Sequence, residues 1–265
     1  MENLEYRALN IRKNIIKMIY EASSGHPGGA LSCADILTVL YFSEMNIENP
    51  NDENRDRFVL SKGHASAALY ATLAEKGFIE QEELKGFRNI NSILQGHPDM
   101  KKIPGVDMST GSLGQGLSVA NGMAIAGKLD KKDYRVYCIV GDGEIEEGQI
   151  WEAAMTAGHY KLDNLCLIID NNNLQIDGKI TEVMNSTPIA EKFKSFGFNV
   201  IKIDGNDIEE IEEAFKKARK AKDRPTAIIA KTIKGKGVSF MEDKAEWHGK
   251  APSKEEYEIA MNELA

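Results

Sequence analysis

The amino-acid sequence predicts an α/β fold with a doubly wound, mainly parallel sheet and helices on both faces. Two observations support this prediction. Short β-branched runs alternate with longer amphipathic segments, as in βα units that feed a parallel sheet. The predicted strands are also almost continuously apolar, which is typical of strands buried on both faces. No repeat, Pro-rich linker or low-complexity block interrupts the alternation, so we expect a single domain over residues 1–265.

The elements follow in order along the chain. Strands are predicted at 57–60 (RFVL), 135–140 (RVYCIV), 164–169 (NLCLII), 198–203 (FNVIKI) and 226–230 (TAIIA). Helices are predicted at about 4–22, 32–45, 64–77, 113–129, 149–161, 188–196 and 207–222, several of them opened by Ser, Asp or Pro and closed by Gly.

The last stretch, 232–265, is Gly- and Lys-rich and ends in a short helical pattern at 253–264. We expect it to form a loop and helix extension packed on the edge of the domain. The basic stretch 231–237 is expected to be a solvated loop after a strand.

Composition excludes several classes of protein. The chain has 33 Lys and Arg against 41 Asp and Glu, a net charge of −8, which argues against a general affinity for nucleic acid. No apolar run approaches the roughly 20 residues of a membrane span, and the first residues lack the apolar core of a secretory signal, so we expect a cytoplasmic protein. Cys33, Cys138 and Cys166 form no CxxC pair and are expected to be buried thiols.

Polar residues follow two of the predicted strands. Gly141-Asp142-Gly143 comes directly after 135–140, and Asp170-Asn171-Asn172-Asn173 comes after 164–169. Ligands bind at the carboxyl ends of strands in open α/β sheets. The glycines let backbone N–H groups approach an anion, and the carboxylate and amide oxygens suit a hard divalent cation. From spacing alone, an ordinary loop and an Asn-rich turn remain equally good interpretations.

Asn172 stands thirty residues after Asp142, and a GDG followed at this distance by Asn-Asn resembles the thiamine diphosphate signature. The resemblance implies thiamine diphosphate with Mg²⁺, or Ca²⁺ as the alternative. It further implies that Asp142, Asn172 and the backbone oxygen of Leu174 hold the metal, and that Gly141 and Gly143 lie at the diphosphate.

Four of the five histidines lie in small Gly- or Pro-flanked motifs. These are His26 in SGHPGG, His64 in SKGHAS, His97 in QGHPD and His248 in WHG. A single loop histidine is usually only solvated, but four together suit a sugar site, because imidazoles contact hydroxyls and move protons near neutral pH. His159 lies in a helical segment and is expected to be structural.

With STGSLGQG at 109–116 and EGQIWEA at 147–153, these motifs resemble the amino-terminal, diphosphate-binding domain of transketolases in order and approximate spacing over nearly the whole chain. The resemblance implies that His64 and His248 lie near the diphosphate, that His26 and His97 face hydroxyls of a ketose donor, and that Gly111 and Leu113 line the cofactor cleft. It implies catalytic roles for His26, His97, His248 and Glu147.

Two glutamates receive a role from the same resemblance. Glu147 is implied to lie where paired domains meet and to link two active sites through a proton network, and Glu152 is implied on the cofactor side. Both also have a simple interpretation as carboxylates at a helix amino terminus, which the helix dipole favours.

The resemblance also implies a partner. In the family, a glutamate on a second, pyrimidine-binding domain activates the cofactor, and that domain would follow Ala265. A truncated chain and a naturally split enzyme both fit, and we expect a natural amino-terminal subunit that assembles with a carboxyl-terminal subunit, two of each. The implied reaction moves a two-carbon ketol unit from a ketose phosphate to an aldose phosphate. The alternatives are a non-catalytic relative and a subunit of a deoxyxylulose phosphate synthase-like or other ketol-transfer enzyme, and the sugars stay open.

Overall fold

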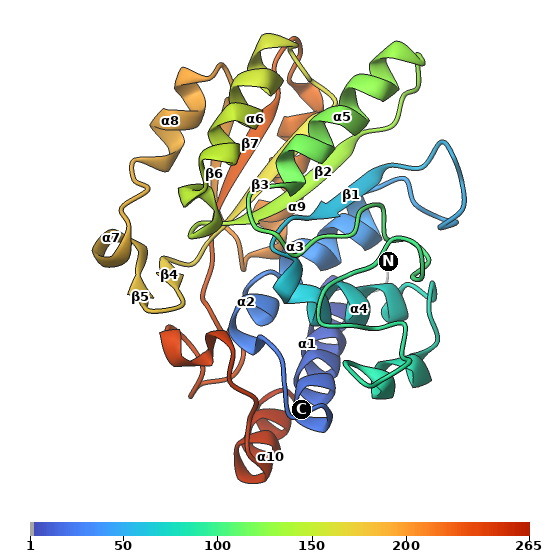
Figure 1. Ribbon diagram of the computed structural model, residues 1–265, viewed down its shortest axis with the longest axis vertical. Coiled ribbons are helices and arrows are strands. Elements are labelled where there is room, and N and C mark those ends of the chain that lie inside the picture. Colours follow the sequence, from blue (N-terminus) through green and yellow to red (C-terminus); the bar gives the residue numbers. More distant parts are fainter. Residues whose placement is uncertain (1–2) are drawn as a thin grey trace.

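A five-stranded parallel sheet forms the centre of the computed structural model, which describes residues 3–265 (Figure 1). Its strands are β1 (Arg57–Leu60), β2 (Val136–Gly141), β3 (Leu165–Asn171), β6 (Asn199–Asp204) and β7 (Thr226–Lys231). The strand order is β1-β2-β3-β7-β6, and every neighbouring pair is parallel. All five predicted strands are confirmed, each to within two residues.

Alternate residues of the strands enter two separate cores. Tyr137 and Ile139 of β2 face one core and Cys138 and Val140 face the other, as the two-residue period of a strand requires. The first core contains α1 (Leu4–Glu21), α3 (Ala34–Val39), α4 (Ser66–Glu75) and α9 (Ile208–Lys220). The second contains α5 (Gly116–Leu129), α6 (Gly148–His159) and α8 (Ile189–Ser195). Helices therefore cover both faces of the sheet, as predicted.

Several helices begin at the residues that the sequence marks. The Asn3 side chain accepts from the backbone of Glu5 at 2.9 Å to start α1, and Asp207 accepts from Glu210 at 3.0 Å to start α9. Such caps satisfy backbone N–H groups that have no partner within the helix. Ser253 forms a reciprocal capping box at the start of α10 (Lys254–Glu263).

One predicted helix is wrong in its continuity. The segment 32–45 is not a single helix but the end of a broken one, made of α2 (Pro27–Ser32), α3 and a turn of π-helix, η1 (Leu40–Glu44). The helix starts early because Pro27 suits a first helical position. It breaks at Cys33, next to Ser32, whose hydroxyl donates to Asp170 at 2.5 Å. This contact joins distant parts of the chain and leaves no mark on local periodicity.

Shorter elements went unpredicted. They are η2 (Gly63–Ala65), η3 (Gln81–Gly86), η4 (Glu144–Glu146), β4 (Leu174–Gln175), β5 (Gly178–Lys179), α7 (Ile180–Val183) and η5 (Ala245–His248). The motif at 109–116 is a loop up to Gly116, where α5 starts. Most of these pieces lie at the carboxyl ends of the strands, where loops shape ligand sites.

The carboxyl-terminal stretch contributes to the interior. Helix α10 packs against α1, and the Tyr257 ring stacks on Tyr20 with 4.1 Å between ring centroids. The stretch 231–237 was expected to be a solvated loop. This expectation is wrong for Lys234, which is only 2% exposed. Trp247 is also buried. This stretch therefore brings Lys234 and Trp247 into the interior, while its closing helix packs on α1.

Two expectations from composition can be compared with the structure. Cys33, Cys138 and Cys166 are free and buried, as expected. Within residues 3–265, no helix has both the length and the apolar character needed to cross a bilayer.

Candidate active site

The predicted site residues, except Glu152, meet in one cleft at the carboxyl ends of the strands. Its cavity measures about 370 Å³. The cleft is lined by the four loop histidines, both loop motifs and the two strand ends, namely His26, His64, His97, His248, Gly111, Leu113, Gly141, Asp142, Gly143, Glu147, Asn172 and Leu174. Motifs that are spread over more than two hundred residues of sequence therefore line a single cavity.

Strand register explains why the two polar turns adjoin. Gly141 at the end of β2 pairs with Asp170 of β3, so Asp142 and Asn172 leave neighbouring strands at the same edge of the sheet. The Asp142 carboxylate accepts from the backbone N–H of Gly143 at 2.9 Å and also from that of Asn173. These two contacts fix its orientation.

Asp142 is a buried carboxylate that forms no ion pair with Lys, Arg or His within residues 3–265. The residue is 1% exposed, and burial, followed by the nearby charge of Asp170, raises its pKa to about 7. A divalent cation here would stabilise the ionised form and remove this cost. The Asn172 amide oxygen and the Leu174 carbonyl are the neutral oxygens that would complete such a set.

The remaining donors must come from elsewhere. Among residues 3–265 there is no cluster of three or more His, Cys, Asp and Glu side chains arranged for a metal. One carboxylate with an amide and a carbonyl suits an ion that keeps further places for phosphate oxygens and water, as Mg²⁺ does. The residues present therefore fit a metal that is bound together with an anionic ligand.

Two buried lysines give the cleft a positive wall that the sequence analysis missed. Lys234 lies 3.0 Å from Nδ1 of His248 and donates to the Leu174 carbonyl at 3.3 Å. Burial lowers its pKa to about 8. Lys62, from the SKGHAS motif, is 2% exposed and lines the same cavity. Ammonium groups withdrawn from water are suited to an anionic ligand such as a diphosphate.

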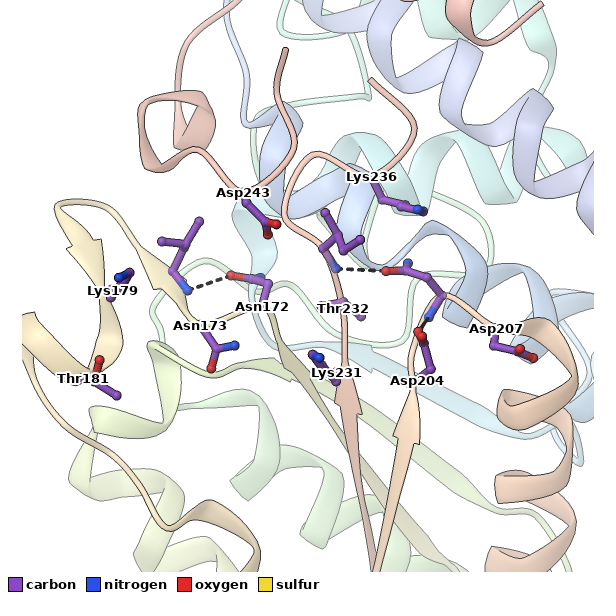
Figure 2. A pocket seen from close by; sticks show the side chains of 13 residues that line it. Asn172, Asn173, Lys179, Thr181, Asp204, Asp207, Lys231, Thr232, Lys236 and Asp243 are labelled. Carbon is purple, nitrogen blue, oxygen red and sulfur yellow. Dashed lines mark hydrogen bonds between the residues drawn. The ribbon is translucent and has the colours of Figure 1, made fainter. Parts of the chain in front are cut away.

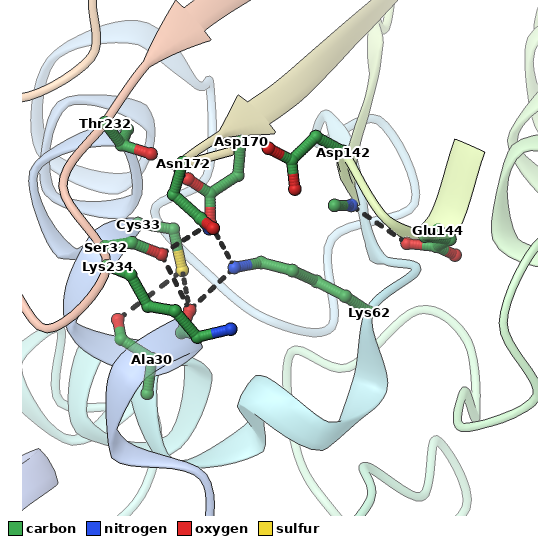
Figure 3. Close-up of polar contacts among 12 residues, drawn as sticks. Ala30, Ser32, Cys33, Lys62, Asp142, Glu144, Asp170, Asn172, Thr232 and Lys234 are labelled. Atoms are coloured by element: carbon green, nitrogen blue, oxygen red, sulfur yellow. Dashed lines mark hydrogen bonds and ion pairs between the residues drawn. The ribbon is translucent and has the colours of Figure 1, made fainter. Parts of the chain in front are cut away.

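Lys62 is held by a buried polar network beneath the cleft (Figure 3). Its ammonium forms an ion pair with Asp170 and donates to the Gly29 carbonyl at 2.6 Å. Asp170 also accepts from the hydroxyls of Ser32, at 2.5 Å, and Thr232. Burial alone would lower the pKa of Lys62, but Asp170 outweighs it and the pKa is raised. Lys62 therefore stays charged.

Three histidine rings form a compact group above this network. The ring centroids of His26, His64 and His248 are 5.2 to 5.4 Å apart. Burial is the largest cause that lowers their pKa values, to about 4, about 2 and about 3 respectively, and nearby cations add to it. His97 is less buried, and its pKa is lowered in the same direction by burial and Arg88. All four are neutral near pH 7.

This neutrality makes a pH prediction for the isolated chain. Folded His64 takes up its proton near pH 2, whereas an unfolded histidine does so near 6.5, so acid favours the unfolded chain. Between pH 7 and pH 5 this group alone should remove about 2 kcal/mol from the free energy of unfolding. His64→Gln should therefore flatten the pH dependence of urea denaturation by that amount. His159→Gln, at the exposed end of α6, is the control, and equal slopes for His64→Gln and wild type would contradict the prediction.

Glu144, directly after the GDG turn, organises the loops of the cleft and was also missed. Its buried carboxylate accepts from the Ser61 hydroxyl, from Gly114 N–H at 2.9 Å and from Gly141 N–H at 3.1 Å. Burial raises its pKa, which these three hydrogen bonds oppose. Glu144 thus joins the SKGHAS, STGSLG and GDG motifs.

The two other predicted glutamates lie differently. Glu147 is exposed, stands at the N-cap position of α6 without a side-chain capping hydrogen bond, and lines the mouth of the cleft. Glu152 is also exposed but lies more than one turn further along α6, outside the residues that line the cleft. Glu152 does not line this cleft, and its role in cofactor binding stays a prediction. His159 likewise lies outside the cleft, beside Tyr160.

A second, larger cavity of about 810 Å³ adjoins the cleft at the ends of β6 and β7 (Figure 2). It shares Asn172 and Leu174 with the cleft. Its charged side chains, among them Lys231 and Asp204, are mostly exposed. Perturbed, buried ionisable groups mark functional sites better than volume does, so we place the active site in the smaller cleft.

Comparison with known proteins shows the family of this chain. Residues 5–264 match the family model described as transketolase, thiamine diphosphate binding domain. The chain is 45% identical to one of the subunits of the apulose-4-phosphate transketolase of Phocaeicola vulgatus, over 100% of this chain and 95% of that protein. It is 44% identical to the 6-deoxy-6-sulfo-D-fructose transketolase subunit SqwG of Clostridium sp. over 99% of this chain and 96% of that protein.

A solved transketolase structure has the same fold over nearly the whole chain. The crystal structure of transketolase from Campylobacter jejuni matches with a TM-score of 0.92 and 38% identity, covering 98% of this chain and 42% of that chain. This chain thus spans less than half of a single-chain transketolase, but nearly all of the two subunits.

Proposed function

The chain belongs to the transketolase family, as a thiamine diphosphate-binding domain, and on this premise we propose that it is the amino-terminal subunit of a two-chain transketolase. The proposed reaction transfers a two-carbon ketol unit from a ketose phosphate to an aldose phosphate. The observation that supports it most is the convergence, in one 370 Å³ cleft, of a metal-ready strand end, two buried lysines and four neutral histidines.

We propose that Mg²⁺ is held by Asp142, by the Asn172 side chain and by the Leu174 carbonyl, with Ca²⁺ able to use the same oxygens. The backbone turn at Gly141 and Gly143 would face the diphosphate. Lys62, whose side chain passes Gly141, and Lys234, which donates to the Leu174 carbonyl, would balance its charge. When bound, thiamine diphosphate supplies the electron sink for breaking and forming the carbon–carbon bond.

The histidines would act on the sugar. His26, His97 and His248 are neutral and line the cavity, so they can donate to hydroxyl and carbonyl oxygens without carrying charge into the site. His64, the most buried of the four, would contact the cofactor side, with Gly111 and Leu113 along the cleft. The named relatives differ in their sugars, so we propose the reaction class here and not a particular ketose.

A partner chain would complete the site. Two relatives of almost equal length carry subunit names, which supports a division of the enzyme between two polypeptides. We propose a carboxyl-terminal subunit with the pyrimidine-binding domain, an assembly of two of each, and a cytoplasmic location. Glu147, exposed at the start of α6 and at the mouth of the cleft, would lie at the contact between paired domains and carry protons between sites.

Ketol transfer tests the proposal directly. We expect xylulose 5-phosphate and ribose 5-phosphate, or another ketose and aldose phosphate pair from a panel, to react with thiamine diphosphate and Mg²⁺ only when this chain is mixed with its partner. The chain alone is expected to be inactive. Full activity from the chain alone, or no activity with any pair in a mixture shown to be assembled, would contradict the proposal.

A further inference from the structure

Arg88 stands behind His26 and belongs to none of the sequence motifs of the cleft. It follows η3, and its guanidinium reaches back to the SGHPGG segment, where Nη1 donates to the Ser24 hydroxyl at 2.7 Å. Nη2 lies 3.3 Å from Nδ1 of His26. A guanidinium has donors and no acceptor, so Nδ1 must accept. A neutral His26 that accepts at Nδ1 carries its proton on Nε2.

The loop around Arg88 is shaped for this contact. Arg88 has a φ of 60°, in the left-handed region that costs a residue other than glycine about 1 kcal/mol or more, and its backbone N–H donates to Leu94 at 2.8 Å. A Cβ placed on Gly96 would lie 3.1 Å from the guanidinium carbon. The strained backbone of Arg88 and the missing side chain at Gly96 therefore both leave room for the guanidinium to reach His26.

We propose that Arg88 is a positioning residue that holds His26 as the neutral Nε2–H tautomer, so that His26 offers the ligand a hydrogen-bond donor and not a base. Naming the ligand oxygen as a hydroxyl or carbonyl of the ketose donor rests on the proposed function; the tautomer does not. His26 lines the cleft, and no hydrogen bond to its Nε2 occurs within residues 3–265. That nitrogen is the one left to meet a ligand.

The surrounding charges act in the same direction. Burial first, then Arg88, His97 and Lys234, lower the pKa of His26, and the rings of His64 and His248 that face it carry no negative charge. No acidic side chain is among these neighbours to support an imidazolium. The consequence for the reaction is that His26 selects and orients oxygen acceptors, while proton removal falls to other groups.

Nitrogen NMR of the histidine rings tests the tautomer on the chain alone, without cofactor or substrate. In ¹⁵N-histidine-labelled protein at pH 7, long-range ¹H–¹⁵N correlations distinguish a protonated from an unprotonated ring nitrogen, and His26→Gln identifies the signals of His26. We expect a bare Nδ1 and a protonated Nε2. A proton on Nδ1, or a doubly protonated ring, would overturn the proposal.

Two variants test the role of Arg88 itself. Arg88→Met should release the tautomer, giving averaged nitrogen shifts, and should move the titration midpoint of His26 from about 4 toward the ordinary 6.5. Gly96→Ala keeps the arginine but displaces it, and should move the midpoint the same way by less. Lys85→Met removes an exposed cation from η3 and is the matched control, with no expected change. An unchanged tautomer and midpoint in both Arg88→Met and Gly96→Ala would overturn the proposal.

These measurements separate the tautomer from the proposed function. A wild-type chain with the expected Nε2–H signal but no ketol transfer in the assembled mixture would contradict the proposed function and support the proposed tautomer. Ketol transfer with the opposite tautomer would do the reverse. The wild-type spectrum and Gly96→Ala decide the matter even where Arg88→Met does not fold.

Discussion

Asp142→Asn is expected to lower ketol transfer by the assembled enzyme at least about 100-fold. Residues that merely support a metal ligand cost 10- to 100-fold when they are changed, and Asp142 is the only carboxylate in the proposed ligand set. The amide is nearly isosteric, but its single oxygen can accept from only one of the two backbone N–H groups, so the contact with Gly143 or with Asn173 is lost. The loss of activity should therefore appear as higher concentrations of Mg²⁺ and thiamine diphosphate needed for half-maximal activity. Titrating each in the ketol-transfer assay measures this.

Stability separates this effect from misfolding. In the metal-free chain, Asp142 is buried beside Asp170, so removing its charge should offset the cost of the lost backbone hydrogen bond, and the variant should stay folded. Wild type should gain stability when Mg²⁺ and the cofactor are added, and Asp142→Asn should not. Asp177→Asn, in the exposed turn between β4 and β5, is the matched control and should behave as wild type. Normal activity of Asp142→Asn at ordinary cofactor concentrations would contradict the proposed metal site.

Lys62→Met is expected to destabilise the chain by about 3–5 kcal/mol, the usual result of leaving one partner of a buried ion pair alone. Asp170 is fully buried and would keep only the hydroxyls of Ser32 and Thr232 as partners, while the Gly29 carbonyl would lose its donor. Urea denaturation of the chain, followed by circular dichroism, measures the loss.

A charge-matched pair of variants makes this prediction specific. Lys85→Met removes a short but exposed ion pair, with Glu82, and should leave the denaturation midpoint unchanged. Asp170→Leu added to Lys62→Met removes the unpaired charge and should recover part of the loss. A Lys62→Met chain as stable as wild type would show that the buried pair does not hold this end of the sheet together.

The sequence could predict most of the architecture because local pattern carries it. The five strands are short apolar runs between helical periods, and each lies where the pattern places it. The broken helix from Pro27 to Glu44 could not be predicted, because its break accompanies a hydrogen bond between Ser32 and Asp170, 138 residues apart. Periodicity registers neighbours along the chain and not such contacts.

The same reason explains which residues of the candidate site could be named from the sequence and which could not. Residues within motifs, such as Asp142 and His64, could be named from the sequence, whereas Lys234 was assigned to a solvated loop and is buried. Lys62 and Glu144 stand inside or beside the named motifs, and that adjacency was the available signal. Arg88 gave none, because its contact with Ser24 spans 64 residues and arises only from the fold.

The most direct test of the central claim is calorimetric titration of thiamine diphosphate, with and without Mg²⁺, into this chain, its partner and the mixture. The claim is that this chain carries the diphosphate and metal half of a shared site. We expect weak, Mg²⁺-dependent binding to this chain alone, and much tighter binding to the mixture, because the partner adds contacts that the single chain cannot make. Mg²⁺-independent binding to the mixture, or binding to the partner alone as tight as to the mixture, would contradict the claim.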